Sequence, residues 1–300
     1  MIAEIKNINK KIAGKDIIRD ISFSLNKNEV IALVGPNGAG KTTLLKLLTG
    51  LISLDNGLIN ICGFNIQTER ENALAETSFM QDSSMLYQDL TGYEHLHFIA
   101  NINKKSSVFI QEITEELGIS DYIHKKVSKY SLGMMQHLLL AIAILSKPKL
   151  LLLDEPLNGL DPTSSTLLRG IIIKLRNQGT SVLFSSHILA EVDKVADRIL
   201  FIREGTIIAE KIMENIDSLN VSYKFYISQP EEAVLLLSKE NFIIEVKRLE
   251  KNELQLTLSG SYLNEVIKIL SNANIDILDI KKIEFHTESI YRELYGDIKQ

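Results

Sequence analysis

Cysteine, tryptophan and proline are scarce in this sequence of 300 residues, which has one cysteine, no tryptophan and five prolines. The single thiol, Cys62, excludes an internal disulfide and any cysteine-rich zinc site, and its apolar surroundings favour a packing role. The 16 glycines and five prolines are too few for a collagen-like or proline-rich chain. Hydrophobic residues make up 45% and charged residues 24%, so we expect a globular protein. The single cysteine is consistent with a reducing compartment.

An excess of positive charge is also missing. The 33 lysines and arginines stand against 38 aspartates and glutamates, which gives a net charge of −5. The part from Asp217 to Gln300 holds ten basic and fourteen acidic residues, so neither part of the chain is basic. A nucleic-acid-binding surface normally carries a basic patch, so no nucleic-acid partner is expected.

Long hydrophobic runs are absent as well. The richest ones, such as Leu138–Leu145 and Leu150–Leu153, fall well short of the ~20 residues of a membrane-spanning helix. The first residues, MIAEIKNINKK, lack the apolar centre of a secretion signal. We therefore expect a cytoplasmic chain whose membrane role, if it has one, comes through a partner.

The predicted elements divide the chain into residues 1–216 and 217–300. The first part begins with loosely alternating segments typical of antiparallel strands, followed by Val30–Val34, an apolar run typical of a strand buried on both faces. Residues from about 82 to 146 have helical spacing, with a capping box at Thr91-Gly92-Tyr93-Glu94. Further helices are predicted at 43–51, 107–117, 131–145, 162–177 and 188–196, and strands at 58–66, 150–153, 181–184, 198–202 and 206–210.

This alternation of strands and helices predicts an α/β fold with ligands at the carboxyl ends of the strands. Asp161 is suited to cap the helix that begins at Pro162, and Glu204-Gly205 is suited to a hairpin turn. The elements predicted within residues 217–300 have the order β-α-β-β-α-β, which suggests a small ferredoxin-like α+β domain. The short amphipathic segment SIYRELYG follows it.

The segment GPNGAGKTT follows the buried strand and opens a helix. Its glycines allow backbone N–H groups to turn towards phosphate oxygens, and the helix dipole adds to the attraction. In this motif Lys41 reaches the β- and γ-phosphates, and the hydroxyl of Thr42 coordinates Mg²⁺. The residues expected around the nucleotide are Gly35, Pro36, Asn37, Gly38, Ala39, Gly40, Lys41, Thr42 and Thr43.

A second part of the site is predicted at LLLLDEP, residues 150–156. The apolar strand ends in Asp154, whose carboxylate can hold Mg²⁺ directly or through water, and Glu155 can polarise the attacking water as a general base. Alone, this pair would indicate only a helix cap after a buried strand. Its position downstream of a phosphate-binding loop favours the catalytic interpretation.

Between the two motifs lies YSLGMMQ, residues 130–136, and here the sequence resembles the ATP-binding subunit of an ABC transporter over about residues 1–215. The segment is similar to the signature of that family, which is usually close to LSGGQ. The resemblance implies a P-loop NTPase cassette with a RecA-like α/β core, an antiparallel β subdomain and a helical subdomain. It also implies that Ser131, Gly133 and Gln136 contribute to a nucleotide site whose phosphate loop belongs to the opposite subunit.

Three further residues match the family by position. Gln81, after TSFM, resembles the glutamine that touches Mg²⁺ or the attacking water and faces the membrane partner. Asp161, in NGLDP, resembles the aspartate that links the two sites of the dimer. His187, in LFSSH, resembles the histidine that hydrogen-bonds the γ-phosphate.

The sequence also departs from the family pattern. The family often has an aromatic residue that stacks on adenine, where this chain has Ile12. We hypothesise loose base selectivity, which a strict preference for ATP over GTP in turnover would contradict. Leu132 and Met134 replace a glycine and a glutamine of the signature, and His137 replaces an arginine, but Ser131 and Gly133 are kept, so activity is expected.

The resemblance implies an ATPase that works as a head-to-tail dimer closing over two MgATP, at the inner face of the cell membrane. Its partner would be an integral-membrane permease of the ABC-2 type, as in ATPases of bacitracin- and lantibiotic-resistance exporters. Two alternatives stay open: a non-transport ABC ATPase acting on a soluble or ribosomal partner, and a weakly hydrolysing regulatory cassette. The cargo and its direction are not readable from the sequence.

Overall fold

The computed structural model describes residues 1–213, 220–249, 252–259, 262–283 and 287–296. The chain forms two compact units, one made of Met1–Met213 together with Ile290–Gln300 and the other of Glu214–Ser289. None of the helices in the described part of the chain has the length and apolar character of a membrane span.

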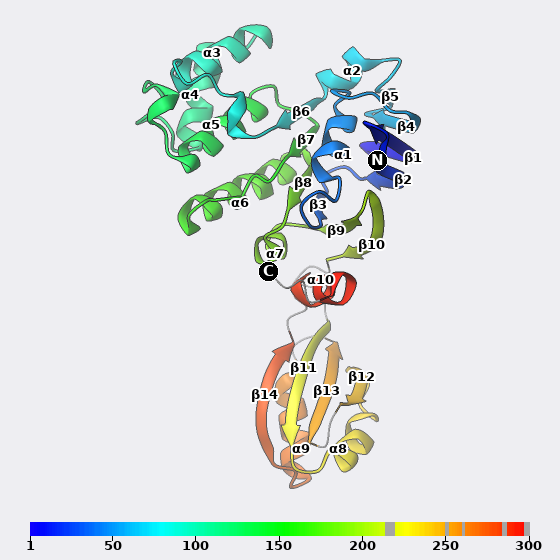
Figure 1. The fold of residues 1–300 in the computed structure, drawn as a ribbon. Helices are drawn as coiled ribbons and strands as arrows, with labels where there is room; N and C mark the ends of the chain where they lie inside the picture. The colour runs from blue at the N-terminus through cyan, green and yellow to red at the C-terminus, as the bar shows by residue number, and fades with distance from the viewer. Residues whose placement is uncertain (214–219, 250–251, 260–261, 284–286, 297–300) are drawn as a thin grey trace. The chain divides into compact units, whose positions relative to one another are not determined.

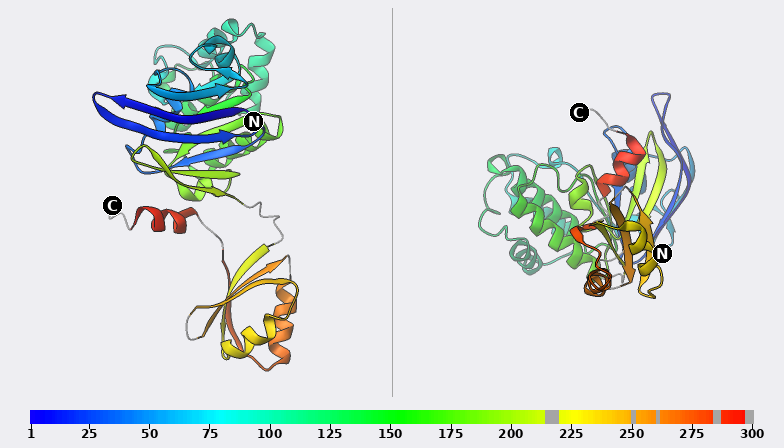
Figure 2. Two further views of the ribbon diagram at one scale, coloured as in Figure 1. Left: turned by 90° about the vertical axis from the view of Figure 1, so that its right-hand side faces the viewer. Right: turned by 90° about the horizontal axis from the view of Figure 1, so that it is seen from below.

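The first unit contains a four-stranded antiparallel sheet in the order β2-β1-β4-β5. Its strands are β1 (Ala3–Ile12), β2 (Lys15–Leu25), β4 (Asn56–Ile61) and β5 (Phe64–Asn65). The predicted strand at 58–66 is therefore two strands, because Cys62 and Gly63 both take positive φ angles, 53° and 89°, and turn the chain between them. Figure 2, left, shows the long β1–β2 hairpin in dark blue.

The second sheet of this unit has six strands in the order β10-β9-β3-β8-β7-β6, all parallel to their neighbours except β10. Its strands are β3 (Val30–Val34), β6 (Thr77–Met80), β7 (Leu150–Leu153), β8 (Ser181–Ser186), β9 (Arg198–Arg203) and β10 (Thr206–Ile212). All residues of β3, β7 and β8 are buried. The prediction of a strand buried on both faces at Val30–Val34 is confirmed.

Seven helices belong to the cassette part of this unit: α1 (Lys41–Leu48), α2 (Arg70–Ala75), α3 (Gly92–Ile102), α4 (Ser107–Glu116), α5 (Leu132–Ile144), α6 (Pro162–Asn177) and α7 (Leu189–Val192). Helices α3, α4 and α5 gather in a group of their own, away from the β1–β2 hairpin (Figure 1). The predicted capping box is confirmed, since Thr91 and Glu94 exchange both of its hydrogen bonds. Helix α7 is shorter than the predicted segment at 188–196.

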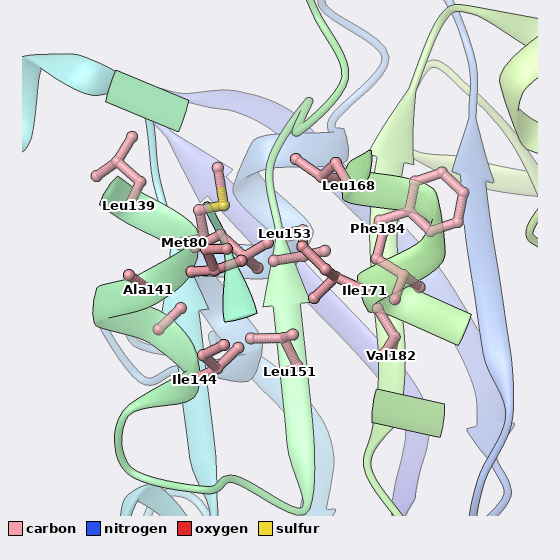
Figure 3. Close-up of a cluster of buried hydrophobic side chains, with 14 of the residues drawn as sticks. Met80, Leu139, Ala141, Ile144, Leu151, Leu153, Leu168, Ile171, Val182 and Phe184 are labelled. Carbon is pink, nitrogen blue, oxygen red and sulfur yellow. The ribbon is translucent and has the colours of Figure 1, made fainter. Parts of the chain in front are cut away.

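Two hydrophobic clusters lie on opposite faces of the six-stranded sheet, and alternate residues of one strand enter each. Leu151 and Leu153 of β7 belong to the first cluster, whereas Leu150 and Leu152 belong to the second. In the first cluster the β7 side chains lie between those of α5 and those of α6 (Figure 3). The buried strands thus fix the carboxyl ends of β3, β7 and β8 in a rigid frame.

The second unit is an α+β sheet in the order β12-β13-β11-β14, antiparallel throughout. Its elements are β11 (Asn220–Ile227), α8 (Pro230–Leu237), β12 (Ile243–Arg248), β13 (Glu253–Ser259), α9 (Leu263–Asn272) and β14 (Ile277–Ile283). They follow the predicted order β-α-β-β-α-β, around a hydrophobic cluster of their own. We call this unit the accessory unit.

A last helix, α10 (Thr287–Tyr295), follows the accessory unit in the chain. Its residues from Ile290 onward belong to the first unit, beside α7 and the β9–β10 hairpin in Figure 1. The sequence prediction had grouped this amphipathic segment with residues 217–300.

Candidate functional site

The loop predicted to bind phosphate connects β3 to α1, and its glycines are required by geometry. A side chain at Gly35 would place its Cβ 2.2 Å from the carbonyl oxygen of Ile202. Gly38 and Gly40 have φ angles of 79° and 107°, which glycine adopts without strain. Gly40 is the N-cap of α1, so the first helical residue is Lys41 and not Thr43 as predicted.

Lys41 lies inside this loop and is only 7% exposed. Its ammonium Nζ donates to the carbonyl oxygen of Gly35 at 2.7 Å and lies 3.3 Å from that of Pro36. Thr42 is exposed on the next position of the helix, and Thr43 is half-buried. The loop therefore presents a buried cation and an accessible hydroxyl at the carboxyl end of β3.

Asp154 and Glu155 follow β7, at the same end of the sheet. The backbone N–H of Asp154 donates to the carbonyl of Met80 at 3.0 Å, which places the end of β6, and with it Gln81, beside the two carboxylates. Glu155 has a φ angle of 48°, a backbone conformation that a glutamate rarely adopts.

The carboxylate of Glu155 is shared by two partners. His187 Nδ1 lies 2.7 Å from its Oε2, and Lys41 Nζ lies 3.4 Å from its Oε1. An ionised carboxylate only accepts hydrogen bonds, so the histidine donates from Nδ1. The structure thus brings Lys41, Glu155 and His187 from three different segments to one point.

Ser185 completes this cluster, although the sequence analysis did not single it out. Its hydroxyl donates to Asp154 Oδ1 at 2.7 Å and accepts the backbone N–H of Glu155 at 2.8 Å. The side chain is fully buried. A signal was present, since serines are unusual at the end of an otherwise apolar, buried strand that leads into His187.

The signature residues lie in a different place, at the start of α5. The hydroxyl of Ser131 caps the helix by accepting the N–H of Met134 at 3.2 Å, and the residue is exposed. A Cβ at Gly133 would lie 3.3 Å from the hydroxyl of Ser164 on α6. Gln136 is buried, and in the described part of the chain its Oε1 has no hydrogen-bond partner.

Asp161 and His137 lie close to the signature. Asp161 caps α6 by accepting the N–H groups of Thr163 and Ser164 at 2.9 and 3.0 Å, and the bonds from Ser164 lower the pKa of this carboxyl. His137 is buried beside Tyr122, 3.4 Å from its hydroxyl. Burial lowers the pKa of His137, while the charge of Asp161 acts in the opposite direction.

The oxygen donors of the site fit Mg²⁺ held together with phosphates. Within the described residues, no three His, Cys, Asp or Glu side chains gather into a metal-binding group. Mg²⁺ is typically bound by one or two protein oxygens together with substrate phosphates and water. An exposed Thr42 hydroxyl near a phosphate-binding loop, and an Asp154 whose Oδ1 is fixed by Ser185, are donors of that kind.

An apolar groove opens next to Gln81. It encloses about 400 Å³ and is lined by Phe79, Met80, Gln81, Met85, Leu86, Tyr87, Leu90, His95, Phe98, Ile99, Leu139 and Ile142. Tyr87 and Phe98 are 71% and 63% exposed, which is unusual for aromatic side chains. His95 fixes the loop that forms one wall, because its Nε2 accepts the backbone N–H of Tyr87 at 3.0 Å.

Comparisons with known proteins identify the family of the chain. The family described as ABC transporter matches residues 18–158. An uncharacterised ABC transporter ATP-binding protein of Bacillus subtilis, YhcH, is 37% identical over 100% of this chain and 97% of its own length. The lantibiotic transport ATP-binding protein SrtF of Streptococcus pyogenes is 37% identical over 72% of this chain and 93% of its own.

The bacitracin transport ATP-binding protein BcrA of Enterococcus faecalis is 28% identical over 98% of this chain and 96% of its own length. A solved structure of the ATP-binding subunit of an ABC transporter matches 90% of this chain and 100% of that chain, with 23% identity and a TM-score of 0.66. This last likeness concerns the fold.

Proposed function

The chain belongs to the family of ABC transporter ATP-binding proteins, and from this premise we propose that it powers an exporter whose permease is a separate chain. Members of this family are ATPases coupled to transport, so ATP is its substrate. Relatives named for lantibiotic and bacitracin transport support a peptide antibiotic or a similar drug as cargo. The cluster of Lys41, Glu155 and His187 carries the proposal for hydrolysis.

Each residue of the cluster has a role that its contacts support. The backbone N–H groups of residues 37–43 and the ammonium of Lys41 bind the phosphates of ATP. Glu155 accepts a proton from the attacking water as general base. His187 lies with Nδ1 2.7 Å from Glu155, which keeps that carboxylate oriented. An imidazolium, which carries a proton on both ring nitrogens, would also donate from Nε2 to the γ-phosphate.

The hydroxyl of Thr42, the carboxylate of Asp154 and the amide of Gln81 are proposed to hold Mg²⁺. The ion, when bound with ATP, neutralises charge on the β- and γ-phosphate oxygens. The strand ends support this assignment, because β6 and β7 are parallel neighbours and bring Gln81 and Asp154 to the same edge of the sheet.

The signature residues are proposed to act on the nucleotide of a second copy or of a related subunit. Ser131 is exposed at the N-terminus of α5, where the free N–H groups and the helix dipole attract an anion. Its contacts lie with α5 itself and not with the cluster around Glu155. A head-to-tail dimer would bring the two halves of each site together.

The apolar groove beside Gln81 is proposed as the contact for the permease. Its exposed aromatic side chains, Tyr87 and Phe98, suit the apolar face of an amphipathic helix. Because Gln81 lines the groove and also follows the strand next to Asp154, a partner there can respond to the bound nucleotide. This contact would hold the chain at the cytoplasmic face of the membrane.

Steady-state turnover of ATP by the purified 300-residue chain tests the enzymatic part. Glu155→Gln is expected to bind ATP with unchanged affinity and to lower turnover by roughly two orders of magnitude or more, the scale of general-base help. Glu76→Gln, which removes a carboxylate paired with Lys149 at the amino ends of β6 and β7, is the control and should keep wild-type turnover per folded molecule. Near-normal turnover by Glu155→Gln would show that Glu155 is not the general base. Slow ATP turnover by the wild-type chain would favour a weakly hydrolysing regulatory cassette.

Affinity capture tests the partner. Tagged Glu155→Gln protein is recovered with MgATP from solubilised membranes of its own organism, and the proteins bound to it are identified. A multi-span membrane protein without its own ATP-binding domain is the expected partner. Capture of ribosomes or soluble proteins alone would contradict a role in export.

A further inference from the structure

The C-terminal helix α10 packs against the first unit with one apolar face. Ile290, Tyr291, Leu294 and Tyr295 contact the hydrophobic cluster that also contains Val34, the last residue before the phosphate-binding loop. The rings of Tyr291 and Tyr295 are stacked, with centroids 4.2 Å apart. This helix is the last element of the chain and is separated in sequence from the rest of the first unit by the whole accessory unit.

Two polar contacts fix the end of α10 to strand β9. Arg203 Nη1 donates to the carbonyl of Leu294 at 2.9 Å, a last-turn carbonyl that has no partner within the helix. The hydroxyl of Tyr295 donates to the carbonyl oxygen of Ile202 at 2.9 Å and lies 3.3 Å from that of Val34. Burial raises the pKa of Tyr295 well above its usual value, so the phenol keeps its proton and remains a donor.

These two carbonyls form the root of the phosphate-binding loop. The carbonyl of Val34 belongs to the peptide bond that joins β3 to Gly35. The carbonyl of Ile202 stands so close to Gly35 that a Cβ there would lie 2.2 Å from it. The hydroxyl of Tyr295 therefore lies between the carbonyl oxygens of Ile202 and Val34, next to the peptide bond at which the loop leaves β3.

The same β9–β10 hairpin also holds the other end of the loop. The backbone N–H of Gly205 donates to the carbonyl of Ala39 at 2.9 Å. The hairpin thus supports the loop at Gly35 and at Ala39, and α10 is bound to the strand that leads into this hairpin. A change in α10 reaches the loop through the hydroxyl of Tyr295, whose one proton is shared between the carbonyl of Ile202 on β9 and the more distant carbonyl of Val34 on β3.

We propose that Tyr295 is a positioning residue for nucleotide binding, through which α10 holds the root of the phosphate-binding loop in its binding conformation. The inference rests on the proposed function in requiring that the chain binds ATP. A loop held in that conformation does not pay an ordering cost when ATP binds. If the loop is held less firmly, fewer molecules have the conformation that binds ATP. The apparent dissociation constant for ATP then rises in inverse proportion to the fraction of molecules in that conformation.

The test compares Tyr295→Phe with Tyr291→Phe in the full chain. Each variant loses one hydroxyl from the same stacked pair, but only the hydroxyl of Tyr295 contacts the root of the loop. Tyr295→Phe is expected to bind a fluorescent ATP analogue roughly threefold to tenfold more weakly, which corresponds to the loss of one hydrogen bond. The KM for ATP should rise by the same factor, with kcat within about twofold of wild type, while Tyr291→Phe binds as wild type does.

Hydrogen exchange separates positioning from simple stability. In Tyr295→Phe, the amides of Gly35 and of residues 37–40 are expected to exchange faster than in Tyr291→Phe, while those of β7 and β8 are unchanged. A Tyr295→Phe variant that melts earlier but binds the analogue with wild-type affinity and protects the loop normally would overturn the proposal. Failure of the wild-type chain to bind the analogue would instead contradict the proposed function.

Discussion

At the scale of single residues, the hydroxyl of Ser185 joins the two carboxylates that follow β7. It fixes one oxygen of Asp154 and accepts the backbone N–H of Glu155, whose φ angle of 48° needs such support. Ser185→Ala leaves a buried N–H without its partner and frees Asp154 to rotate. We expect kcat for ATP to fall by roughly tenfold, a loss of about 1.4 kcal/mol in the transition state, and the half-saturating Mg²⁺ concentration to rise.

The next residue provides the control for this measurement. Ser186 is also buried at the end of β8, but within the residues that the structure describes its hydroxyl accepts just the local N–H of Ile188, at 3.0 Å. Ser186→Ala should therefore keep the Mg²⁺ dependence of the wild type. Equal effects of the two substitutions on that dependence would mean that Ser185 serves packing alone.

His137 makes the stability of the helical group depend on pH. Burial lowers its pKa in the folded protein, so the unfolded chain binds a proton at higher pH than the folded chain does. This part of the stability is present above the unfolded pKa of about 6.5 and is lost as the pH falls below it. The free energy of unfolding, measured by denaturant at pH 7.5 and 5.5, should decrease more for wild type than for His137→Gln. An equal decrease would show that His137 does not titrate on unfolding.

At the scale of elements, local signals predicted the boundaries that depend on neighbouring residues. Helix α6 begins at Pro162 and ends at Asn177 as predicted, because Asp161 caps it and Pro162 suits the first helical position. Strands β3 and β7 have their predicted bounds because both lie in the centre of a buried sheet. Glu204 and Gly205 both take the positive φ angles that a tight hairpin requires.

Contacts between distant segments could not be predicted in this way. Ser185 meets Asp154 only because β7 and β8 are parallel neighbours, and Tyr295 reaches Val34 across 261 positions of sequence. Neither pairing can be recognised from the residues of a single segment. The phosphate loop and the carboxylates could be predicted because each motif consists of consecutive residues. The groups that hold these motifs in place come from elsewhere in the chain.

The capping box at the start of α3 carries a prediction of its own. Thr91 Oγ1 accepts the N–H of Glu94 at 3.1 Å, and the carboxylate of Glu94 accepts the N–H of Thr91 at 2.7 Å. Thr91→Ala removes one half of this exchange and should lower the free energy of unfolding of the full chain by about 1 kcal/mol. Thr91→Ser keeps the hydroxyl and should lose much less. The two variants are compared by denaturant unfolding. Equal losses in the free energy of unfolding would contradict a capping role for the hydroxyl of Thr91.

At the scale of the whole molecule, one chain holds a phosphate loop and a signature that lie in separate parts of the first unit. Lys41 binds within the loop after β3, while Ser131 caps α5 in the helical group (Figure 1). The composite site that we propose would therefore need a second subunit. Since each copy would offer both halves of the site, the proposed head-to-tail pair would use both surfaces and close on itself, as a two-fold dimer does.

Dimerisation with nucleotide tests this arrangement. Glu155→Gln protein should sediment as a monomer alone and as a dimer with MgATP, because bound ATP is not consumed and its phosphates bridge the subunits. Adding Ser131→Arg should abolish the dimer by steric exclusion at the exposed start of α5, without weakening the binding of ATP to the loop of the same chain. Ser106→Arg is the matched control, since Ser106 is also an exposed residue at the start of a helix but belongs to α4. A buried arginine without a partner is not tolerated in a closed interface. If the dimer survives Ser131→Arg, or if Ser106→Arg disrupts it equally, the subunits must therefore contact each other elsewhere.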